Sequence, residues 1–515
     1  MNKKNDTHNY GMVAICAITI ILAIILVAPT VYISRYAYPW ADDFNYAAET
    51  KHVYDATGSF FKAMARAFET SMESYHDFQG TYLSCFLMAM QPAAFGTRAY
   101  HLTGFIMLGI MFFAYFIFFH CLFHKAWGFS KSVAYSMFAL TYIASVEMVM
   151  GIAEAFTWFC TGAHYTIIHS MFVMYVALLI SHFIEIRNDA NEKSKAINII
   201  SIFFISLLGF LTAGGNFVSV FMGVVFLALL TIVSILYLKL YKHEKLNSYV
   251  SMIPVIGAYF VGSGFNLLAP GNLIRMDITG DTSSFWGTIL NCFITGGYSI
   301  YKFFSVQLFV IILLILFIAW HEIATNKVFD MVSFDFPLPG FVLLLSYCLL
   351  SAEFAPINYM ITETKISDVI RSAFIMNRTS TCIYHTFVLL LVFNEIYFLG
   401  WLYKKNLLKK LPLTVALVIS AVSLIVCAVS AGKKISEDPT CFLTSAAIYN
   451  LQTGTAQYYG YLMEENTNRL KNTEERNVLV LPITVDPSSL YPQDGADWKE
   501  GSKHFYDKDS VEYEE

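Results

Sequence analysis

Long apolar runs separated by short polar segments dominate the pattern of this chain. Runs of roughly 20 apolar residues are long enough to cross a bilayer as helices. We place eleven such spans, at about 11–33, 100–123, 132–151, 165–186, 197–213, 217–238, 249–268, 303–320, 337–352, 380–402 and 411–431. The pattern therefore predicts an all-α polytopic membrane protein. The first run is longer than the roughly 7–15 apolar residues of a cleavable signal, so we expect it to be retained as a span.

Segment 80–96 is apolar, but Pro92 and Gly96 interrupt it. Basic residues help to place it, because cytoplasmic loops are enriched in Lys and Arg. Thirteen Lys and Arg residues fall in one set of alternating loops, 124–131, 187–195, 239–245, 321–331 and 403–410, and four in the other. This rule makes the first set of loops cytoplasmic, together with the N-terminus. That assignment holds only if segment 80–96 does not cross the membrane. We expect a re-entrant or interface-lying helix there, and an extracytoplasmic C-terminus.

Two polar regions flank this membrane domain, 1–431. The first outer loop, 34–99, contains a helical pattern at 59–78 with one apolar and one charged face, which suits a helix in the membrane plane. The tail, 432–515, lies outside and is expected to be a small, loosely ordered appendage with one strand within 476–485. No internal repeat is visible, which disfavours transporters built from inverted repeats.

Composition agrees with a membrane protein. Hydrophobic residues make up 57% of the chain and charged residues 14%, whereas soluble domains carry about 25% charged residues. The net charge of −5 is small, and no Lys/Arg patch suited to nucleic acid occurs. Nine cysteines are scattered singly, so we interpret them as small apolar residues in helices.

Two adjacent carboxylates, Asp42 and Asp43, follow the first span in the stretch YPWADDFNYA. One interpretation is a helix cap, since a carboxylate accepts the free N–H groups of a first turn; this explains one aspartate. The other is a general base or a ligand-positioning carboxylate at the outer membrane surface. One aspartate would then act while the other caps, orients or binds a cation. The pair could hold Mg²⁺ or Mn²⁺, although a phosphate donor met by enough arginine does not require a metal.

Further polar residues gather on the same predicted side of the membrane. Arginine suits phosphate because of its planar, permanently charged fork, but an outer arginine also serves as a topological anchor or headgroup contact. His76 is expected on a solvated helix face. No span carries the charge chain typical of a proton relay. The candidates beyond the acidic pair are Glu154, Trp158, His164, Tyr165, Asn272, Arg275, Arg371 and Arg378.

The chain resembles the GT-C glycosyltransferases, and more specifically poorly characterised bacterial membrane proteins related to the GtrII-like glucosyltransferases. The resemblance covers roughly 40–380 and rests on ADDFNY (41–46), WFCTGAHY (158–165), APGNLIR (269–275) and AP (355–356). It implies a GT-C-like membrane fold. It also implies transfer of a sugar from a polyprenyl-phosphate donor to a cell-envelope acceptor at the outer face of the cell membrane, with inversion at the anomeric carbon.

The resemblance assigns roles to individual residues. Asp43 or Asp42 would activate the acceptor hydroxyl, and Arg275, with Arg371 or Arg378 and Asn272, would bind the donor phosphate. Candidates for acceptor binding or support are Glu154, Trp158, Tyr165 and His76. In one respect the chain departs from the family, whose members often carry an arginine shortly after the in-plane helix. The corresponding stretch QGTYLS (79–84) has none.

Two other classes of function remain open on sequence grounds. A lipid-linked glycan flippase or other transporter would need polar residues along a path through the membrane. A non-catalytic subunit of envelope assembly would tolerate loss of both aspartates. A glycan polymerase or ligase would differ from the transferase only in using a lipid-linked oligosaccharide as donor.

Overall fold

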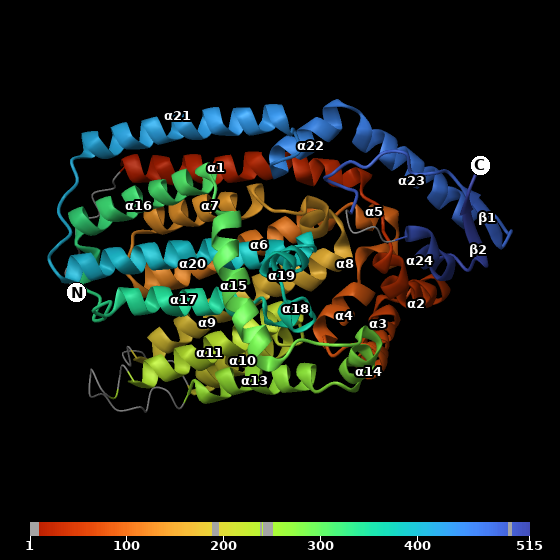
Figure 1. Ribbon diagram of the computed structural model, residues 1–515, viewed down its shortest axis with the longest axis horizontal. Coiled ribbons are helices and arrows are strands. Elements are labelled where there is room, and N and C mark those ends of the chain that lie inside the picture. Colours follow the sequence, from red (N-terminus) through yellow and green to blue (C-terminus); the bar gives the residue numbers. More distant parts are fainter. Residues whose placement is uncertain (1–9, 188–194, 237–238, 240–250, 493–496, 515) are drawn as a thin grey trace.

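The computed structural model describes residues 10–187, 195–236, 239, 251–492 and 497–514 (Figure 1). In this part of the chain the secondary structure is helical apart from one two-stranded sheet. The long helices lie side by side in a bundle, and the first outer loop and the tail gather at one end of it (Figure 1). The basic loops expected at 187–195 and 239–245 fall largely outside the described residues.

The bundle is built from the apolar runs. Its helices are α1 (Tyr10–Ile33), α5 (Thr97–Tyr100), α6 (Thr103–Phe119), α7 (Lys131–Glu147), α8 (Phe159–Thr161), α9 (Ile168–Arg187), α10 (Lys195–Thr212), α11 (Phe217–Leu236), α13 (Ile253–Leu267), α16 (Val306–Asn326), α17 (Pro339–Ala352), α20 (Asn377–Lys404) and α21 (Leu413–Glu437). A short π-helical turn, His120–Ala126, continues α6 at its end, and two others, Ala153–Thr157 and Gly162–Ile167, lie on the approach to α9.

Seven helical segments among the described residues are long and apolar enough to cross a membrane. They contain α1, α6, α9, α11, α16, α20 and α21, and α13 with α14 (Pro270–Thr279) forms a pair, bent by 45°, that could make an eighth. The prediction of a multi-pass helical membrane protein is thus confirmed. Helix length and composition identify seven or eight spans among the described residues, however, and not the eleven expected. The remaining expected spans correspond to α7 and to two shorter apolar helices in α10 and α17.

Helix α15 (Phe285–Phe303) was not expected from the sequence. It runs across the bundle helices rather than along them (Figure 1), and it packs against α17, α18 (Ala355–Tyr359) and α19 (Ile366–Ala373). Apart from Phe303 its buried residues, such as Cys292 and Ser299, are small, while Trp286 is 76% exposed. Because its apolar residues are spread among glycines, threonines and serines, they do not form the continuous run that marks a span.

The first outer loop folds into α2 (Asp42–Thr57), α3 (Phe60–Asp77), α4 (Tyr82–Ala89) and a 3₁₀ turn, Pro92–Phe95. The structure agrees with an amphipathic α3, since Ala63, Ala67 and Ser71 are buried while Phe61 and Phe68 are exposed. Helix α4 has eight residues and rises only about 12 Å. It is therefore too short to cross a bilayer.

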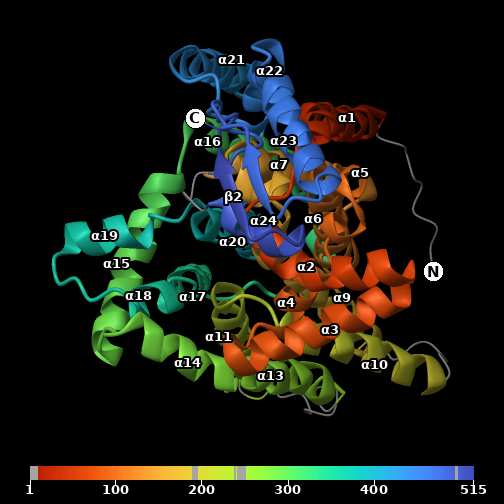
Figure 2. The same ribbon diagram turned by 90° about the vertical axis from the view of Figure 1, so that its right-hand side faces the viewer.

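The described part of the tail is folded rather than loosely ordered. It contains α22 (Leu443–Gln452), α23 (Thr455–Asn472), β1 (Asn477–Val480), α24 (Trp498–Phe505) and β2 (Ser510–Tyr513). The strand expected within 476–485 is β1, and it pairs with β2 in parallel, with Val478 opposite Val511. Helix α24 packs on α2, and Figure 2 shows the two next to each other at this end of the molecule.

Candidate functional site

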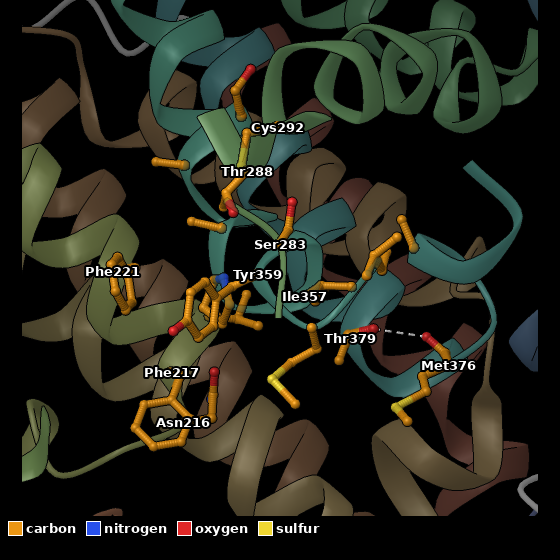
Figure 3. Close-up of a pocket in the computed structure, with 18 of the residues that line it drawn as sticks. Asn216, Phe217, Phe221, Ser283, Thr288, Cys292, Ile357, Tyr359, Met376 and Thr379 are labelled. Carbon is orange, nitrogen blue, oxygen red and sulfur yellow. Dashed lines mark hydrogen bonds between the residues drawn. The ribbon is translucent and has the colours of Figure 1, made fainter. Parts of the chain in front are cut away.

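A cavity of about 1170 Å³ lies between α11, α14, α15, α17 and α18. Phe217 and Phe221 of α11 and Ile357 and Tyr359 of α18 turn toward this space (Figure 3). Apolar side chains form most of the wall. Polar groups are few. Four of them, His164, Tyr165, Asn272 and Arg275, are candidates from the sequence, and Gln79 and Asn216 also line the cavity. Typical small-molecule pockets hold roughly 300–1,000 Å³ and share this mostly apolar lining with a few polar groups, so the cavity has room for a large, mainly apolar ligand.

Arg275 connects the cavity to the first outer loop. Its Nη1 donates a hydrogen bond to Gln79 Oε1 at 2.6 Å, and Gln79 Nε2 donates to the Tyr46 hydroxyl at 3.0 Å. The guanidinium also lies 4.9 Å from the centre of the Phe78 ring. Arg275 itself is exposed, whereas Gln79 is buried. The stretch 79–84 has no arginine of its own, but the structure places Arg275 of α14 beside it.

Close backbone contact holds α14 at this position. A Cβ atom on Gly271 would lie 2.5 Å from the backbone nitrogen of Phe78, and one on Gly80 would lie 1.9 Å from the backbone oxygen of Asn266. Asn272 fastens the same junction, because its Oδ1 accepts from the Gly80 N–H at 2.8 Å and its Nδ2 donates to the Asn266 carbonyl at 2.7 Å. Asn272 therefore has a positioning task in addition to its place on the cavity wall.

Asp43 is completely buried and does not line the cavity. Its Oδ2 accepts from the Tyr100 hydroxyl at 2.5 Å and from the Trp40 N–H at 3.1 Å, and its Oδ1 accepts from the Cys160 N–H at 2.8 Å. Burial raises the pKa of Asp43 to about 6, against the lowering effect of these hydrogen bonds. Asp43 thereby joins the start of α2 to α8, far away in the sequence.

Asp42 is the more accessible of the two aspartates, being half-buried. Neither side chain caps α2 in the expected manner: the N-cap is Ala41, with no side-chain cap hydrogen bond and a positive φ of 38°. Such a φ is strained for a residue other than glycine. Burial raises the pKa of Tyr46, and the Asp42 carboxylate is one of the charged groups that raise it further. Asp42 and the Tyr46–Gln79–Arg275 chain are therefore electrostatically linked.

The other candidates from the sequence lie in different surroundings. Tyr165 lines the cavity together with His164, whose buried Nδ1 has no hydrogen-bond partner among the described residues. Trp158 is buried, and its Nε1 donates to the Trp40 carbonyl at 3.2 Å, which is a packing role. Buried Glu154 lies against Gly151 and Asn377, since a Cβ on Gly151 would come within 2.6 Å of Glu154 Oε2 and 2.8 Å of Asn377 Cβ.

The three remaining candidates also differ from one another. Arg378, half-buried at the start of α20, acts electrostatically on His164 and Tyr165 at the cavity wall. The Arg371 side chain is 79% exposed and lies 3.5 Å from Asp368 of its own helix. His76 is exposed at the end of α3 and does not line the cavity. The structure therefore groups Arg275, Asn272 and Tyr165 on one cavity, with Arg378 near by, and leaves Arg371 and His76 outside it.

The structure also reveals a polar cluster inside the bundle that the sequence did not suggest. His169 and His385 have ring centres 5.3 Å apart, and the Tyr115 hydroxyl lies 3.3 Å from His169 Nε2. Glu353, just after α17, is a separate buried ionisable group, and it accepts from the Thr386 hydroxyl at 2.7 Å. Single polar residues inside apolar runs are the only sequence signal of such a cluster. Gln79 and Tyr46 of the first outer loop, and Asn216 between two expected spans, were not among the sequence candidates because no local pattern shows what each of them contacts.

Asp42 and Asp43 do not belong to a group of three or more close metal-ligating side chains in the described part of the chain. Comparison with known proteins gives no further guidance: no protein-family model, no curated protein and no solved structure matches this chain.

Proposed function

We propose that this protein is a membrane glycosyltransferase that moves a sugar from a polyprenyl-phosphate donor to a cell-envelope acceptor on the outer membrane face. The observation that carries the proposal is the position of Arg275. This cation stands on the wall of a large, mainly apolar cavity and is hydrogen-bonded to the loop that carries the acidic pair. A ligand with a long apolar chain and an anionic head needs both features.

In the proposed reaction, the acceptor hydroxyl attacks the anomeric carbon while the bond from that carbon to the phosphate oxygen breaks. Asp42 takes the hydroxyl proton as general base. Arg275, supported by Arg378, meets the charge that develops on the departing phosphate, and fixed cations are effective in this role. Asp43 acts through the backbone: it holds the turn that presents Asp42, and it does not touch the reacting atoms.

The proposed topology follows from the same assignment. Eleven crossings are formed by α1, α6, α7, α9, α10, α11, α13, α16, α17, α20 and α21, while α3, α4 and α15 remain at the outer face. The N-terminus is then cytoplasmic and the C-terminus extracytoplasmic, as the positive-inside rule predicts. Gln79, on the cavity wall, belongs to the same outer loop as the acidic pair, so the proposal has the lipid-linked donor and the envelope acceptor meet at this loop.

The test is mass spectrometry of envelope glycans and lipid-linked sugars in a deletion strain complemented with wild type, Arg275→Gln or Asp42→Asn. We expect wild type to restore one sugar to the glycan, and both variants to leave the donor accumulating. Arg476→Gln, an exposed tail arginine paired with Asp509, serves as the control and should complement fully. Full complementation by Arg275→Gln and Asp42→Asn, at equal protein levels, would overturn the proposal.

A transporter of lipid-linked sugars is the second candidate, favoured by the buried His169–His385 pair inside the bundle. Ionisable residues within membrane spans mark substrate or proton pathways more often than structural sites. A transporter would lose function on His385→Phe and keep it on Asp42→Asn, the reverse of the transferase. The same complementation assay therefore separates the two.

A further inference from the structure

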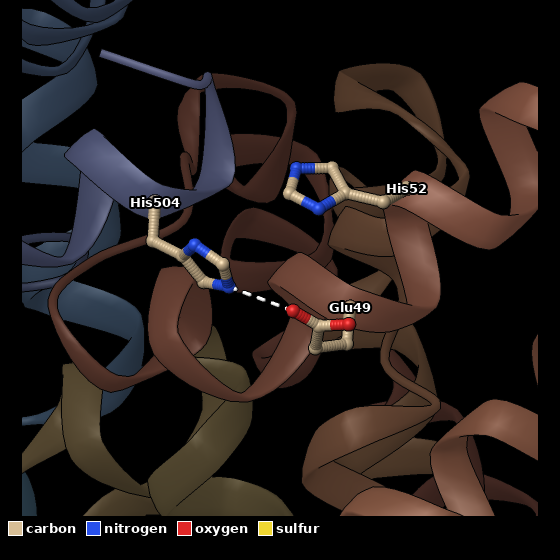
Figure 4. Close-up of side chains that lie close together, drawn as sticks. All are labelled: Glu49, His52 and His504. Atoms are coloured by element: carbon tan, nitrogen blue, oxygen red, sulfur yellow. Dashed lines mark hydrogen bonds and ion pairs between the residues drawn. The ribbon is translucent and has the colours of Figure 1, made fainter. Parts of the chain in front are cut away.

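A cluster of metal-ligating side chains lies where the tail meets the first outer loop. Glu49 and His52 come from α2 and His504 comes from α24 (Figure 4). One ligand atom of each lies within 4.8 Å of the others. His504 Nε2 is 2.9 Å from Glu49 Oε1, and the two histidine rings have centres 5.4 Å apart. Three side chains from segments about 450 residues apart thus converge on one point.

Helix geometry on one side and the end of α24 on the other explain the convergence. Glu49 and His52 are three residues apart on α2, which puts both on one helix face, while Asp507 lies in the turn just after α24, with a positive φ of 56°. This turn brings Asp507 toward α2, since the distance from its Oδ1 to His52 Nε2 is 3.6 Å. That nitrogen is buried and has no hydrogen-bond partner among the described residues. The cluster therefore offers two imidazoles and a carboxylate, with Asp507 within reach as a fourth ligand.

The surrounding charge is compatible with a cation. Arg66 lies 3.2 Å from Glu49 Oε2, but it also contacts Glu69 at 3.5 Å and Glu73 at 2.7 Å. Three carboxylates thus share the Arg66 guanidinium. Arg66 contacts Oε2 of Glu49, whereas Oε1 of Glu49 faces His504. Together with Asp507, the acidic groups outnumber the one guanidinium. The electrostatic environment therefore does not oppose a divalent ion at the histidine side of Glu49.

We propose that Glu49, His52 and His504 form a zinc site that fastens the C-terminal tail to the first outer loop. Two imidazoles and a carboxylate are a ligand set that Zn²⁺ prefers, at about 2.0–2.2 Å from each atom. Ligand atoms on tetrahedral zinc are roughly 3.3 Å apart, so small side-chain rotations close the cluster. The clamped α24 covers the acidic turn, because a Cβ on its Gly501 would lie 2.6 Å from the Ala41 oxygen. The proposal is independent of the reaction that the protein performs.

The test is calorimetric titration of Zn²⁺ into the purified full-length protein, without a polyhistidine tag and after treatment with chelator. We expect one Zn²⁺ per chain in the wild type. The double variant His52→Gln/His504→Gln should bind at least a hundredfold more weakly, and Mg²⁺ at the same concentration should give no comparable binding. Zn²⁺ should also slow hydrogen exchange in α24 of the wild type and leave the double variant unchanged.

A matched pair of variants separates metal binding from the Arg66 ion pairs. Glu49→Gln removes a zinc ligand together with a partner of Arg66, whereas Glu73→Gln removes only a partner of Arg66. We expect weaker Zn²⁺ binding in the first and wild-type binding in the second. Wild-type Zn²⁺ affinity in the double histidine variant, or equal binding of Mg²⁺, would overturn the proposal. No measurable Zn²⁺ binding by the wild type would do the same.

Discussion

The acidic turn and the cavity wall hold their charged side chains in opposite ways. The Asp43 carboxylate is fully buried and accepts three hydrogen bonds from Tyr100, Trp40 and Cys160. Arg275 of α14 is exposed beside an apolar cavity and donates to Gln79 of the first outer loop. A fully buried carboxylate that accepts three hydrogen bonds organises the structure around it, while an exposed guanidinium on a cavity wall can be reached by a ligand. The two regions can be tested against each other.

The largest expected effect is on stability, in Asp43→Ala. The variant leaves the Tyr100 hydroxyl and the N–H groups of Trp40 and Cys160 without their buried acceptor, and each such group costs about 1–3 kcal/mol. We expect the free energy of unfolding to fall by about 4 kcal/mol, measured by thermal or denaturant unfolding in detergent. Asp42→Ala, at the half-buried neighbour, is the control and should change it by less than about 1 kcal/mol. Equal losses in the two variants would contradict the structural role of Asp43.

The next effect is on activity, in Arg275→Gln. Removing one fixed donor from a developing oxyanion typically lowers the rate by roughly 10²–10³-fold, and we expect a loss of about this size in sugar transfer. The unfolding transition should stay near that of the wild type because Arg275 is exposed. The measurement is transfer from a polyprenyl-phosphate sugar in proteoliposomes. An unfolding transition as low as that of Asp43→Ala would show that both regions are structural.

A smaller effect concerns pH. Burial raises the pKa of Asp43 to about 6, above the value of about 3.9 in an unfolded chain. The folded state therefore binds the extra proton, and this contribution to stability is fully present below about pH 4 and is lost as the pH rises through 6. Between pH 5 and pH 7 we expect a loss of about 1 kcal/mol. The pH dependence should vanish in Asp43→Asn, which carries no titrating carboxyl, and its persistence there would assign it to another group.

The smallest effect is expected for Arg371→Gln. The side chain is 79% exposed and its partner Asp368 belongs to the same helix, an arrangement that contributes about 0.5 kcal/mol or less. Transfer activity should remain within about twofold of the wild type. A loss as large as that of Arg275→Gln would mean that α19 closes over the cavity when the donor binds.

Some features of the protein follow from local sequence. A continuous apolar run predicts a membrane helix because both its length and its polarity are local properties. The amphipathic α3, the short α4 before Pro92 and the strand β1 are recognisable for the same reason. By contrast, α15 has no continuous apolar run, so its course across the bundle is decided by the helices it covers. The membrane class and the candidate stretches thus follow from the sequence, but one helix of the cavity wall does not.

The candidate site divides in the same way. Sequence alone places Asp42, Asp43 and Arg275 among the polar residues outside the spans. Only the tertiary structure brings Arg275 to Gln79, 196 residues away, turns Asp43 inward, and brings His504 to Glu49, 455 residues away. Residue type and local pattern determine which groups can carry charge or bind an ion. Which of them meet depends on helix packing, and packing depends on contacts between segments that no local pattern contains.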